Sequence, residues 1–304
     1  ETITLTETVE GTSRLVINVG SGESADFTNI TASTFDSGTD TLTISGSTGG
    51  ETITGPNIAA TISGNAGNDN ITGGSAADII NGGNGNDTID GNDGADTLTG
   101  GSGDDIYIFN SNDVDTGETI VEASSGGTDT ISVITSTDFV NMSNASFDEI
   151  EAINFAGVSQ TATFTGAQLT AETIILNESS TGTSGLIINV GSGETTTFTN
   201  ITAGTFTSGT DTVTINGTTG NETITGSNIA STISGGTGDD TLTGGSQADI
   251  INGGDGADAL TGSAGNDTYN FNTGDVDTGE SITEASSGGT DTISVITSTD
   301  FVNM

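Results

Sequence analysis

Apolar residues along this chain mostly stand alone between polar neighbours. Short segments alternate apolar and polar residues, as in Thr2–Thr6 (TITLT) and Thr161–Thr165 (TATFT). Such alternation is typical of strands that present one set of side chains to each face. Threonine and isoleucine, which dominate these segments, favour a pleated surface. The pattern predicts an all-β protein.

Further strands of this kind are expected at residues 14–19, 39–44, 130–134 and 172–177. No helical periodicity persists, although Phe147–Phe155 could make two helical turns. We favour a strand there, because Ile150, Ile153 and Phe155 lie beside a threonine-rich strand segment.

The chain contains a long internal repeat. Gly11–Glu23 returns with small changes at Gly182–Glu194, 171 residues later. Glu122–Met142 returns without a change at Glu284–Met304, 162 residues later. The two shifts differ by nine residues, so the second copy lacks one nine-residue unit. We expect the chain to be a window from a longer tandem array.

A nine-residue repeat lies inside each long one. Seven nonapeptides run without a gap over Gly46–Ile108, and six run over Gly217–Asn270. Position six is Asp in the last five of the first block and the last four of the second. Position eight is Ile or Leu until the final repeat, which has Tyr107 or Tyr269. One apolar residue per turn predicts a thin core, and each tyrosine is expected to be a wider core residue at the end of its stack.

The repeats divide the chain into six parts. Irregular coils are expected at 1–45 and 172–216, nonapeptide blocks at 46–108 and 217–270, and irregular β segments at 109–171 and 271–304. The likeliest arrangement is one parallel solenoid with irregular coils between the blocks, and separate β-sandwich domains are the alternative.

Charge narrows the possible partners. The chain has 42 acidic residues and a single basic one, Arg14, giving a formal net charge of −41. Such a charge cannot neutralise phosphates, so we expect neither nucleic-acid binding nor membrane insertion. It also opposes compaction, and bound divalent cations would offset it. The chain has no Cys and no His, which excludes disulfides and leaves no ligand that zinc prefers.

The nonapeptides resemble the RTX (repeat-in-toxin) consensus G-G-x-G-x-D-x-U-x, in which U is apolar. Nine turns carry the Asp and the apolar residue in one frame. The resemblance implies a parallel β-roll. Each nonapeptide would give a six-residue turn and a three-residue strand, and two would complete a coil. It also implies secretion from bacteria by the type I route, and folding on extracellular calcium.

The nine aspartates are the expected metal ligands. Because alternate nonapeptides would stack on one side of a β-roll, we expect the pairs Asp69/Asp87, Asp87/Asp105, Asp78/Asp96, Asp240/Asp258 and Asp249/Asp267. Carboxylate and carbonyl oxygens suit calcium, and about five ions are expected. By resemblance, backbone oxygens complete each shell; the candidates are Gly67, Gly74, Gly82, Gly83, Gly85, Gly91, Gly100, Ser102, Gly236, Gly238, Gly245, Gly253 and Gly262.

Four turns depart from the consensus. Position six is Glu51 or Ala60 in the first two turns of one block, and Glu222 or Ser231 in the other. We interpret these turns as coils with poor calcium binding or none. The segment DVDTGE, at 113–118 and 275–280, could add a calcium site or form a solvated turn.

The sequence favours a structural function. Without His, Cys or Lys, the usual pairs of nucleophile and base cannot be built, so we expect no enzyme. The favoured function is a calcium-stabilised extracellular building block of a surface layer, sheath or filament, which associates with neighbouring copies. The alternatives are the extender region of a giant adhesin, and a secretion or binding module of a larger extracellular enzyme or toxin.

Overall fold

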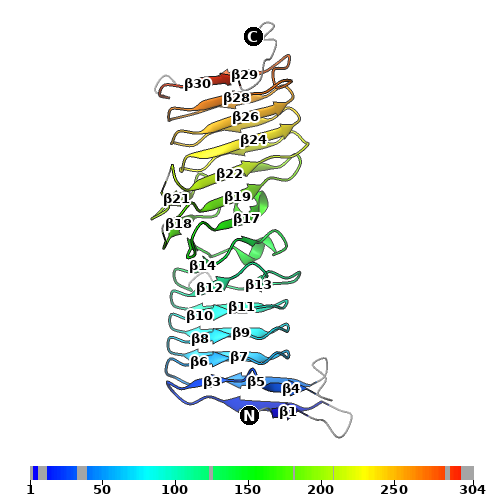
Figure 1. Ribbon diagram of the computed structural model, residues 1–304, viewed down its shortest axis with the longest axis vertical. Coiled ribbons are helices and arrows are strands. Elements are labelled where there is room, and N and C mark those ends of the chain that lie inside the picture. The colour runs from blue at the N-terminus through cyan, green and yellow to red at the C-terminus, as the bar shows by residue number, and fades with distance from the viewer. Residues whose placement is uncertain are drawn as a thin grey trace. The chain divides into compact units, whose positions relative to one another are not determined.

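The computed structural model describes residues 3–5, 12–32, 40–122, 126–180, 182–207, 209–284 and 288–295. The chain forms two compact units, residues 1–154 and 155–304, and each is described by itself. Strands dominate both units (Figure 1). The helical elements of the described residues are the 3₁₀ turn η1 (Asn144–Ser146) and helix α1 (Gly166–Leu169). The predicted all-β class is confirmed.

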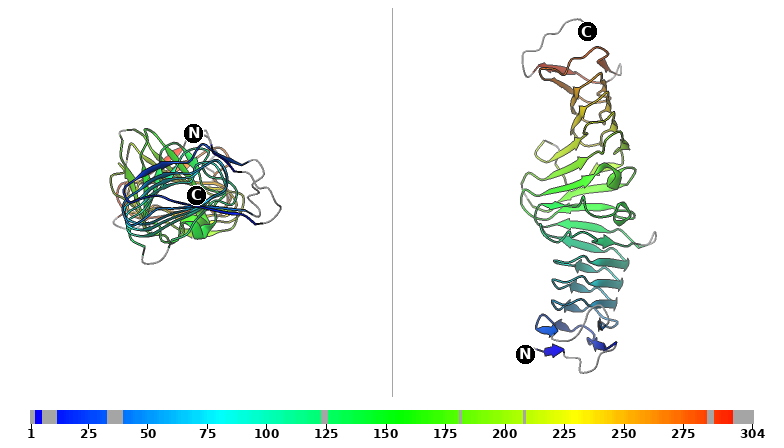
Figure 2. Two further views of the ribbon diagram at one scale, coloured as in Figure 1. Left: turned by 90° about the horizontal axis from the view of Figure 1, so that it is seen from below. Right: turned by 90° about the vertical axis from the view of Figure 1, so that its right-hand side faces the viewer.

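Two parallel sheets build unit 1, and the chain alternates between them. The first contains β2 (Arg14–Asn18), β5 (Thr41–Ser45), β7 (Thr61–Ala66), β9 (Ile79–Asn84), β11 (Thr97–Ser102) and β13 (Thr119–Ile120). The second contains β3 (Ser24–Asp26), β6 (Thr52–Thr54), β8 (Asn70–Thr72), β10 (Thr88–Asp90), β12 (Ile106–Phe109) and β14 (Thr130–Val133). Strand β1 (Ile3–Leu5) pairs with β4 (Ile30–Ala32). The stacked strands are clearest in Figure 2, right.

Unit 2 repeats this arrangement. One sheet contains β17 (Thr161–Thr165), β19 (Gly185–Asn189), β22 (Thr212–Asn216), β24 (Ser231–Thr237), β26 (Ile250–Asp255), β28 (Thr268–Phe271) and β30 (Thr292–Val295). The other contains β20 (Thr195–Thr197), β23 (Thr223–Thr225), β25 (Thr241–Thr243), β27 (Ala259–Thr261) and β29 (Ser281–Thr283). Strand β18 (Ile174–Glu178) pairs with β21 (Ile201–Ala203).

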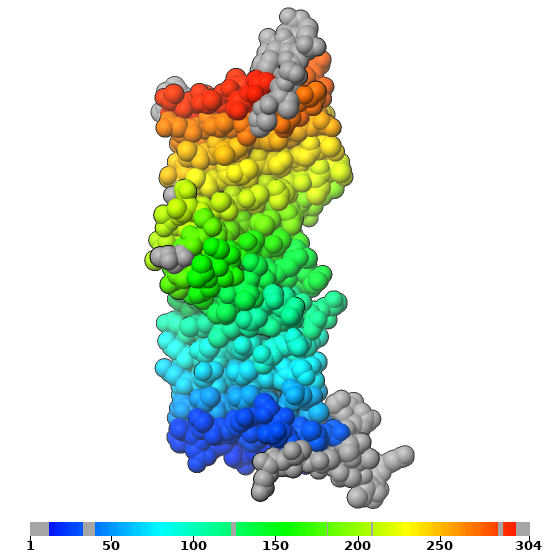
Figure 3. All heavy atoms as spheres, in the orientation of Figure 1, coloured from blue at the N-terminus to red at the C-terminus, as the bar shows by residue number. Residues whose placement is uncertain are grey.

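Strand register shows that two nonapeptides complete one coil. Ile62 of β7 faces Ile80 of β9, which faces Leu98 of β11, so residues 18 apart are aligned. In the other sheet Ile71 faces Ile89, which faces Tyr107. Residues close in sequence therefore share a coil, and in Figure 3, which is coloured by residue number, the nonapeptides of each unit form successive bands. Each coil contacts chiefly the coils before and after it, as expected of a solenoid.

The apolar residue of each nonapeptide forms the core. Ile62, Ile71, Ile80, Ile89 and Leu98 are fully buried. They stack in two facing columns, as the position-eight pattern predicts. Tyr107 is also buried, but the stack does not end there, because β12 continues the sheet to β14. The expectation that the tyrosine closes the stack was therefore wrong.

Several segments outside the blocks join the sheets of the nonapeptides of their unit, whereas β1 pairs with β4 and β18 with β21. β2 and β5 pair with one another and then with β7, and β14 pairs with β12. The solenoid interpretation is confirmed for these segments, and the β-sandwich alternative is not. The strand preferred within Phe147–Phe155 forms as β16 (Ala152–Phe155). Residues 2, 6 and 39 of the expected strands lie outside the described residues.

The segment after the first block has a wider, aromatic core. Phe109, Phe139 and Phe147 are buried, and their rings meet edge to face, with centroid separations of 5.2 Å for Phe109–Phe139 and 6.1 Å for Phe139–Phe147. Such edge-to-face pairs are a preferred aromatic geometry. Phenylalanine rings thus fill the wider core of this segment, as single isoleucines fill the narrower core of the nonapeptide coils.

The tight turns explain the repeated glycines. Gly85 has φ +124°, and a Cβ added to it would lie 2.0 Å from the Gly67 carbonyl oxygen. Both facts exclude a side chain. The turn is also shorter than expected in one sheet. There β7, β9 and β11 are six-residue strands, because pairing continues to residues such as Gly83 and Gly101.

The missing nonapeptide amounts to half a coil, and it changes which sheet the following strand joins. In unit 1, β5 and β12 belong to opposite sheets. Their equivalents in unit 2, β22 and β28, belong to the same sheet. A nine-residue deletion therefore preserves the solenoid but moves everything after it to the opposite face.

Candidate metal centres

The position-six aspartates form continuous hydrogen-bonded rows, here called the aspartate ladders. The backbone N–H of Asp69 donates to Oδ1 of Asp87 at 2.7 Å, and that of Asp87 donates to Oδ1 of Asp105 at 2.7 Å. A second ladder in unit 1 joins Asp78 to Asp96 at 2.7 Å. Unit 2 has the equivalent links Asp240 to Asp258 (2.8 Å) and Asp249 to Asp267 (2.7 Å). The structure thus brings together all five expected pairs.

All nine ladder aspartates are buried, with exposed fractions of 2% or less. The chain's one basic side chain, Arg14, is exposed on β2. No cationic side chain therefore lies within the ladders. Buried carboxylates without a compensating charge are strongly unfavourable, so the ladders require another positive charge or bound protons.

The second carboxylate oxygen of most ladder residues has no hydrogen-bond partner among the described residues. These buried Oδ2 atoms belong to Asp69, Asp87, Asp96, Asp105, Asp240, Asp258 and Asp267. In Asp78 and Asp249 the same atom accepts an N–H bond, from Gly74 at 2.8 Å and from Gly245 at 2.6 Å. Each carboxylate therefore uses Oδ1 to link coils, and seven of the nine keep Oδ2 available.

The first glycine of each nonapeptide makes room for this oxygen. A Cβ added to Gly82 would lie 2.3 Å from Oδ2 of Asp87, and one added to Gly100 would lie 2.3 Å from Oδ2 of Asp105. Gly91, Gly253 and Gly262 stand in the same relation to Asp96, Asp258 and Asp267. Glycine at this position is required by the carboxylate as well as by the backbone.

The predicted backbone ligands lie along the same loops. A Cβ added to Gly101 would lie 2.2 Å from the Gly83 carbonyl oxygen of the neighbouring coil, and one added to Gly103 would lie 2.2 Å from that of Gly85. The Ser102 carbonyl accepts the N–H of Gly85 at 2.7 Å, which leaves it a second lone pair. Gly67 and Gly238 have positive φ in the turns, and Gly236 has positive φ near the end of β24.

Burial disturbs the protonation of the ladder carboxyls. It raises the pKa of Asp87 and of Asp78 to about 6, against partial opposition from the N–H groups that they accept. It raises the pKa of Asp96 to about 7, with like charges from Asp78 and Asp115 adding to the effect. A divalent cation would reverse these shifts, since it binds the ionised form and its binding releases protons.

The residues present fit calcium. The available donors are carboxylate and carbonyl oxygens, and such hard ligands suit calcium rather than a softer metal. The seven buried Oδ2 atoms are directed to places where a cation would satisfy them. The ladder pairs would hold the ions, and the charge supplied would neutralise rows of like-charged carboxylates that otherwise repel one another.

In two of the divergent turns, backbone N–H groups stabilise the buried carboxylate. Glu51 is buried, and it accepts the N–H groups of Gly22 (2.9 Å) and Ser47 (2.9 Å). Burial raises its pKa, but these donors outweigh the effect and hold the pKa below its usual value. Glu222 accepts the N–H groups of Gly193 (2.8 Å) and Gly220 (3.1 Å). Both glutamates begin a ladder without an unsatisfied oxygen.

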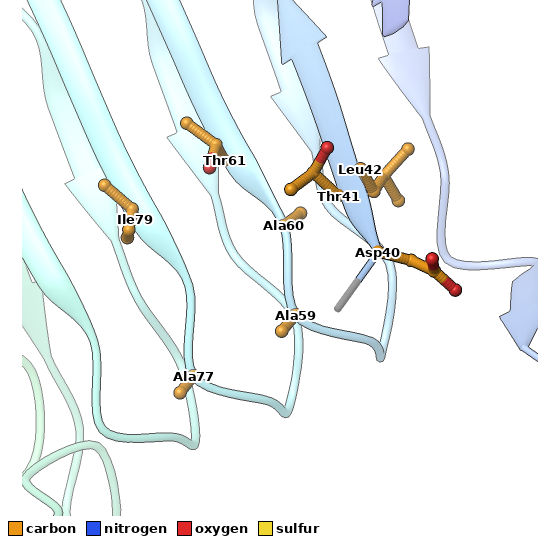
Figure 4. A pocket seen from close by; sticks show the side chains of 8 residues that line it. All are labelled: Asp40, Thr41, Leu42, Ala59, Ala60, Thr61, Ala77 and Ile79. Atoms are coloured by element: carbon orange, nitrogen blue, oxygen red, sulfur yellow. The ribbon is translucent and has the colours of Figure 1, made fainter. Parts of the chain in front are cut away.

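The other two divergent turns interrupt a ladder. Ala60 donates its N–H to Oδ1 of Asp78 at 2.8 Å but offers no carboxylate to the preceding coil. A shallow hollow lies there, lined by Asp40, Leu42, Ala60, Ile79 and neighbouring residues of three consecutive coils (Figure 4). Its counterpart in unit 2 surrounds Ser231. The interpretation that these turns bind calcium poorly stays a prediction, with the missing carboxylate as its reason.

The ladders continue beyond the nonapeptides. Asp129 was not predicted from the sequence, and Glu118 was named only within DVDTGE, with a calcium site and a solvated turn as alternatives. The N–H of Asp105 donates to Asp129 at 2.9 Å, across 24 residues, and that of Asp96 donates to Glu118 at 2.7 Å, across 22 residues. Burial raises the pKa of Glu118 to about 9. Glu118 closes the segment DVDTGE, which therefore packs on the ladder. The signals available were the recurrence of DVDTGE at 275–280 for Glu118 and the exact recurrence of residues 122–142 at 284–304 for Asp129.

Together, the fold and the site define a parallel β-solenoid whose loops carry rows of buried carboxylates suited to calcium. A family model, the RTX calcium-binding nonapeptide repeat, matches four times, at residues 59–89, 81–113, 216–251 and 243–275. These two segments therefore carry RTX calcium-binding nonapeptide repeats, as the resemblance indicated. No curated protein and no solved structure matches the chain.

The matched residues include all nine ladder aspartates but not the carboxylates that continue the ladders beyond the nonapeptides. They extend from Ala59 to Asp113 and from Asn216 to Asp275, so Glu118, Asp129 and their equivalents lie outside the family's pattern. Among the described residues, no helix is long and apolar enough to cross a membrane.

Proposed function

We propose that this chain is a calcium-stabilised extracellular structural protein that assembles with copies of itself into a surface layer, sheath or filament. The observation that carries the proposal is the pair of ladders in each unit, with buried Oδ2 atoms that lack partners. RTX repeat proteins are typically secreted, and calcium is plentiful outside cells. A fold that needs calcium would form there and not before export.

Repetition supports the structural part of the proposal. The two long repeats are nearly identical in sequence, and each forms a solenoid of stacked coils. Stacked units of this kind make stiff rods of adjustable length. The proposal includes no catalytic role, because the sequence has no His, Cys or Lys from which the usual pairs of nucleophile and base are built. The proposed export route is type I secretion, as for similar repeats.

Self-association in calcium tests the proposal. The protein is dialysed against calcium, magnesium or no divalent cation, and examined by analytical ultracentrifugation and electron microscopy. Ordered assemblies that form only in calcium are the expected result. A folded monomer at every calcium concentration would overturn self-assembly and favour a spacer role in an adhesin. Assemblies that form equally well without calcium would overturn the role of the metal.

A further inference from the structure

Three carboxylates converge where each nonapeptide block ends. In unit 1 they belong to Asp105 of the last nonapeptide, to Glu122 and to Asp129, which directly precedes β14. Each offers one oxygen, and the three oxygens lie within 4.8 Å of one another. Unit 2 has the same arrangement in Asp267, Glu284 and Asp291. We call these two groups the terminal clusters.

Both clusters contain buried carboxylate oxygens that have no hydrogen-bond partner among the described residues. The exposed fraction of Asp105 is 1% and that of Asp267 is 0%. Within the described part of the chain, Oδ2 of each has no hydrogen-bond partner, and neither does Oε2 of Glu122 or Glu284. An unsatisfied buried carboxylate oxygen is unfavourable by itself. Two such oxygens next to a third carboxylate are more unfavourable still, and a bound cation would supply the missing partner and positive charge.

The remaining oxygens are held in place by donors. Oε1 of Glu122 accepts the N–H of Gly100 at 2.8 Å and the hydroxyl of Tyr107. Oε1 of Glu284 accepts the N–H of Gly262 at 3.2 Å and the hydroxyl of Tyr269. Oδ1 of Asp129 accepts the N–H of Asp105 at 2.9 Å. The glutamates are thus oriented so that one oxygen is fixed and the other is free to bind.

Glycine leaves the space that these groups need. A Cβ added to Gly100 would lie 2.3 Å from Oδ2 of Asp105 and 2.6 Å from Oε1 of Glu122. A Cβ added to Gly262 would meet Oδ2 of Asp267 at 2.4 Å and Oε1 of Glu284 at 2.5 Å. The same cradle is therefore built twice.

We propose that each terminal cluster is a calcium site of its own, which ties the segment after the block to the last nonapeptide coil. Its donors are three hard carboxylate oxygens, one more carboxylate than a ladder pair supplies. Because calcium affinity rises with the number of charged ligands, the terminal clusters bind calcium before the ladder pairs do. Glu122 and Asp129 lie outside the nonapeptides and outside the matched family residues.

The site rests on calcium binding as proposed above, but its test is separate. Tyr107 and Tyr269 are the chain's only tyrosines, and it has no tryptophan. Each tyrosine contacts the glutamate of one terminal cluster. Terbium emission excited through tyrosine therefore reports on these clusters. In the wild-type protein, we expect the emission to saturate once about two ions per chain have bound, while further ions add little.

Matched variants localise the signal. In a Tyr269→Phe background only Tyr107 can excite terbium, so Glu122→Gln should raise the terbium concentration at half-maximal emission by roughly tenfold. Glu284→Gln makes the same change in charge in the other unit, and it should leave the titration unaltered. Identical titrations for the two variants would overturn the inference. So would wild-type emission that rises in proportion to all the ions bound.

Ion counting separates this inference from the proposed function. After equilibrium dialysis at a calcium concentration that just fills the terminal sites of the wild type, the Glu122→Gln, Glu284→Gln double variant should hold nearly two ions fewer than the wild type. Retention of every ion would contradict the terminal sites while leaving the ladders as the calcium-binding element. If a variant does not fold in excess calcium, the wild-type saturation experiment decides alone.

Discussion

The two oxygens of each ladder aspartate have different roles. Oδ1 accepts a backbone N–H from the neighbouring coil, and in seven of the nine residues Oδ2 is left for a cation. Replacing Asp by Asn preserves an acceptor of the same shape. It removes the charge and places an NH₂ donor at the other position, which cannot bind a cation. Asparagine variants therefore test the metal ligand without removing the link between coils.

Asp87 belongs to two adjacent pairs of its ladder. We expect Asp87→Asn to raise the calcium concentration at the folding midpoint by roughly tenfold, or about 1.4 kcal/mol per affected site. Asp93→Asn is the control, since Asp93 is exposed in the neighbouring loop. Calcium titrations followed by circular dichroism make the comparison. Equal midpoints for the two variants would count against Asp87 as a ligand.

The raised pKa values predict how pH acts on the calcium-free protein. Burial raises the pKa of Asp87 to about 6 and of Asp96 to about 7, from 3.8. Between the ordinary pKa of 3.8 and these raised values, the folded state binds more protons than the unfolded state. The free energy of unfolding therefore falls as the pH rises from about 4 to about 7. Far-UV circular dichroism of calcium-free protein should therefore show more β structure at pH 5 than at pH 7.5. A β signal that grows as the pH rises would contradict this.

The contacts between residues at the regular nonapeptide spacing could be predicted from the sequence, whereas contacts with irregular segments could not. The pairs such as Asp69/Asp87 follow from a strict spacing of 18 residues. Asp129 was missed, and Glu118 was named only within DVDTGE and not as part of a ladder, because irregular segments lengthen that spacing to 24 and 22 residues. The donors to Glu51 were also out of reach, since Gly22 precedes it by 29 residues in a segment without the nonapeptide spacing. Contacts between regular and irregular coils need the fold itself.

At the scale of the element, nonapeptide strands such as β8 and β9 place one side chain in the core and leave its neighbours outside it. On β9, Ile80 is fully buried in the core, whereas its neighbour Ile79 is 55% exposed. The strand is too short for other residues to share the burial. Stability within a coil should therefore depend strongly on the one inward residue and weakly on its neighbour.

This contrast gives a paired test of the core. Ile80→Ala should lower the free energy of unfolding in saturating calcium by about 2–5 kcal/mol, because it leaves a cavity between neighbouring coils. Ile79→Ala removes the same atoms from the exposed face, and it should change that free energy by about 0.5 kcal/mol or less. Denaturant titrations measure both. Similar losses would mean that the two faces are not assigned as described.

At the scale of the molecule, the nonapeptide is a half-coil module. Because strands alternate between two sheets, an odd number of nonapeptides and an even number place the following segment on opposite sheets. The seven- and six-repeat blocks of this chain are one example of each. Varying the number of repeats therefore changes both the length of a unit and the face on which its next segment emerges.

Deleting Gly82–Asp90 from unit 1 tests this directly. The deletion should keep the solenoid but bring β5 and β12 into one sheet, as β22 and β28 are in unit 2. Since the chain has no cysteine, spin labels can be placed through new cysteines at Thr41 and Ile106. Their distance after the deletion should match that between labels at Thr212 and Thr268. An unchanged distance would show that parity does not control the face.

The central claim is that calcium supplies the positive charge that the folded ladders need. Far-UV circular dichroism during a calcium titration, with magnesium as control, tests it most directly. The account predicts that, at neutral pH, β structure appears only with calcium, at roughly millimolar concentrations for an extracellular module. A spectrum that is already rich in β structure in excess chelator, and that calcium does not change, would contradict it.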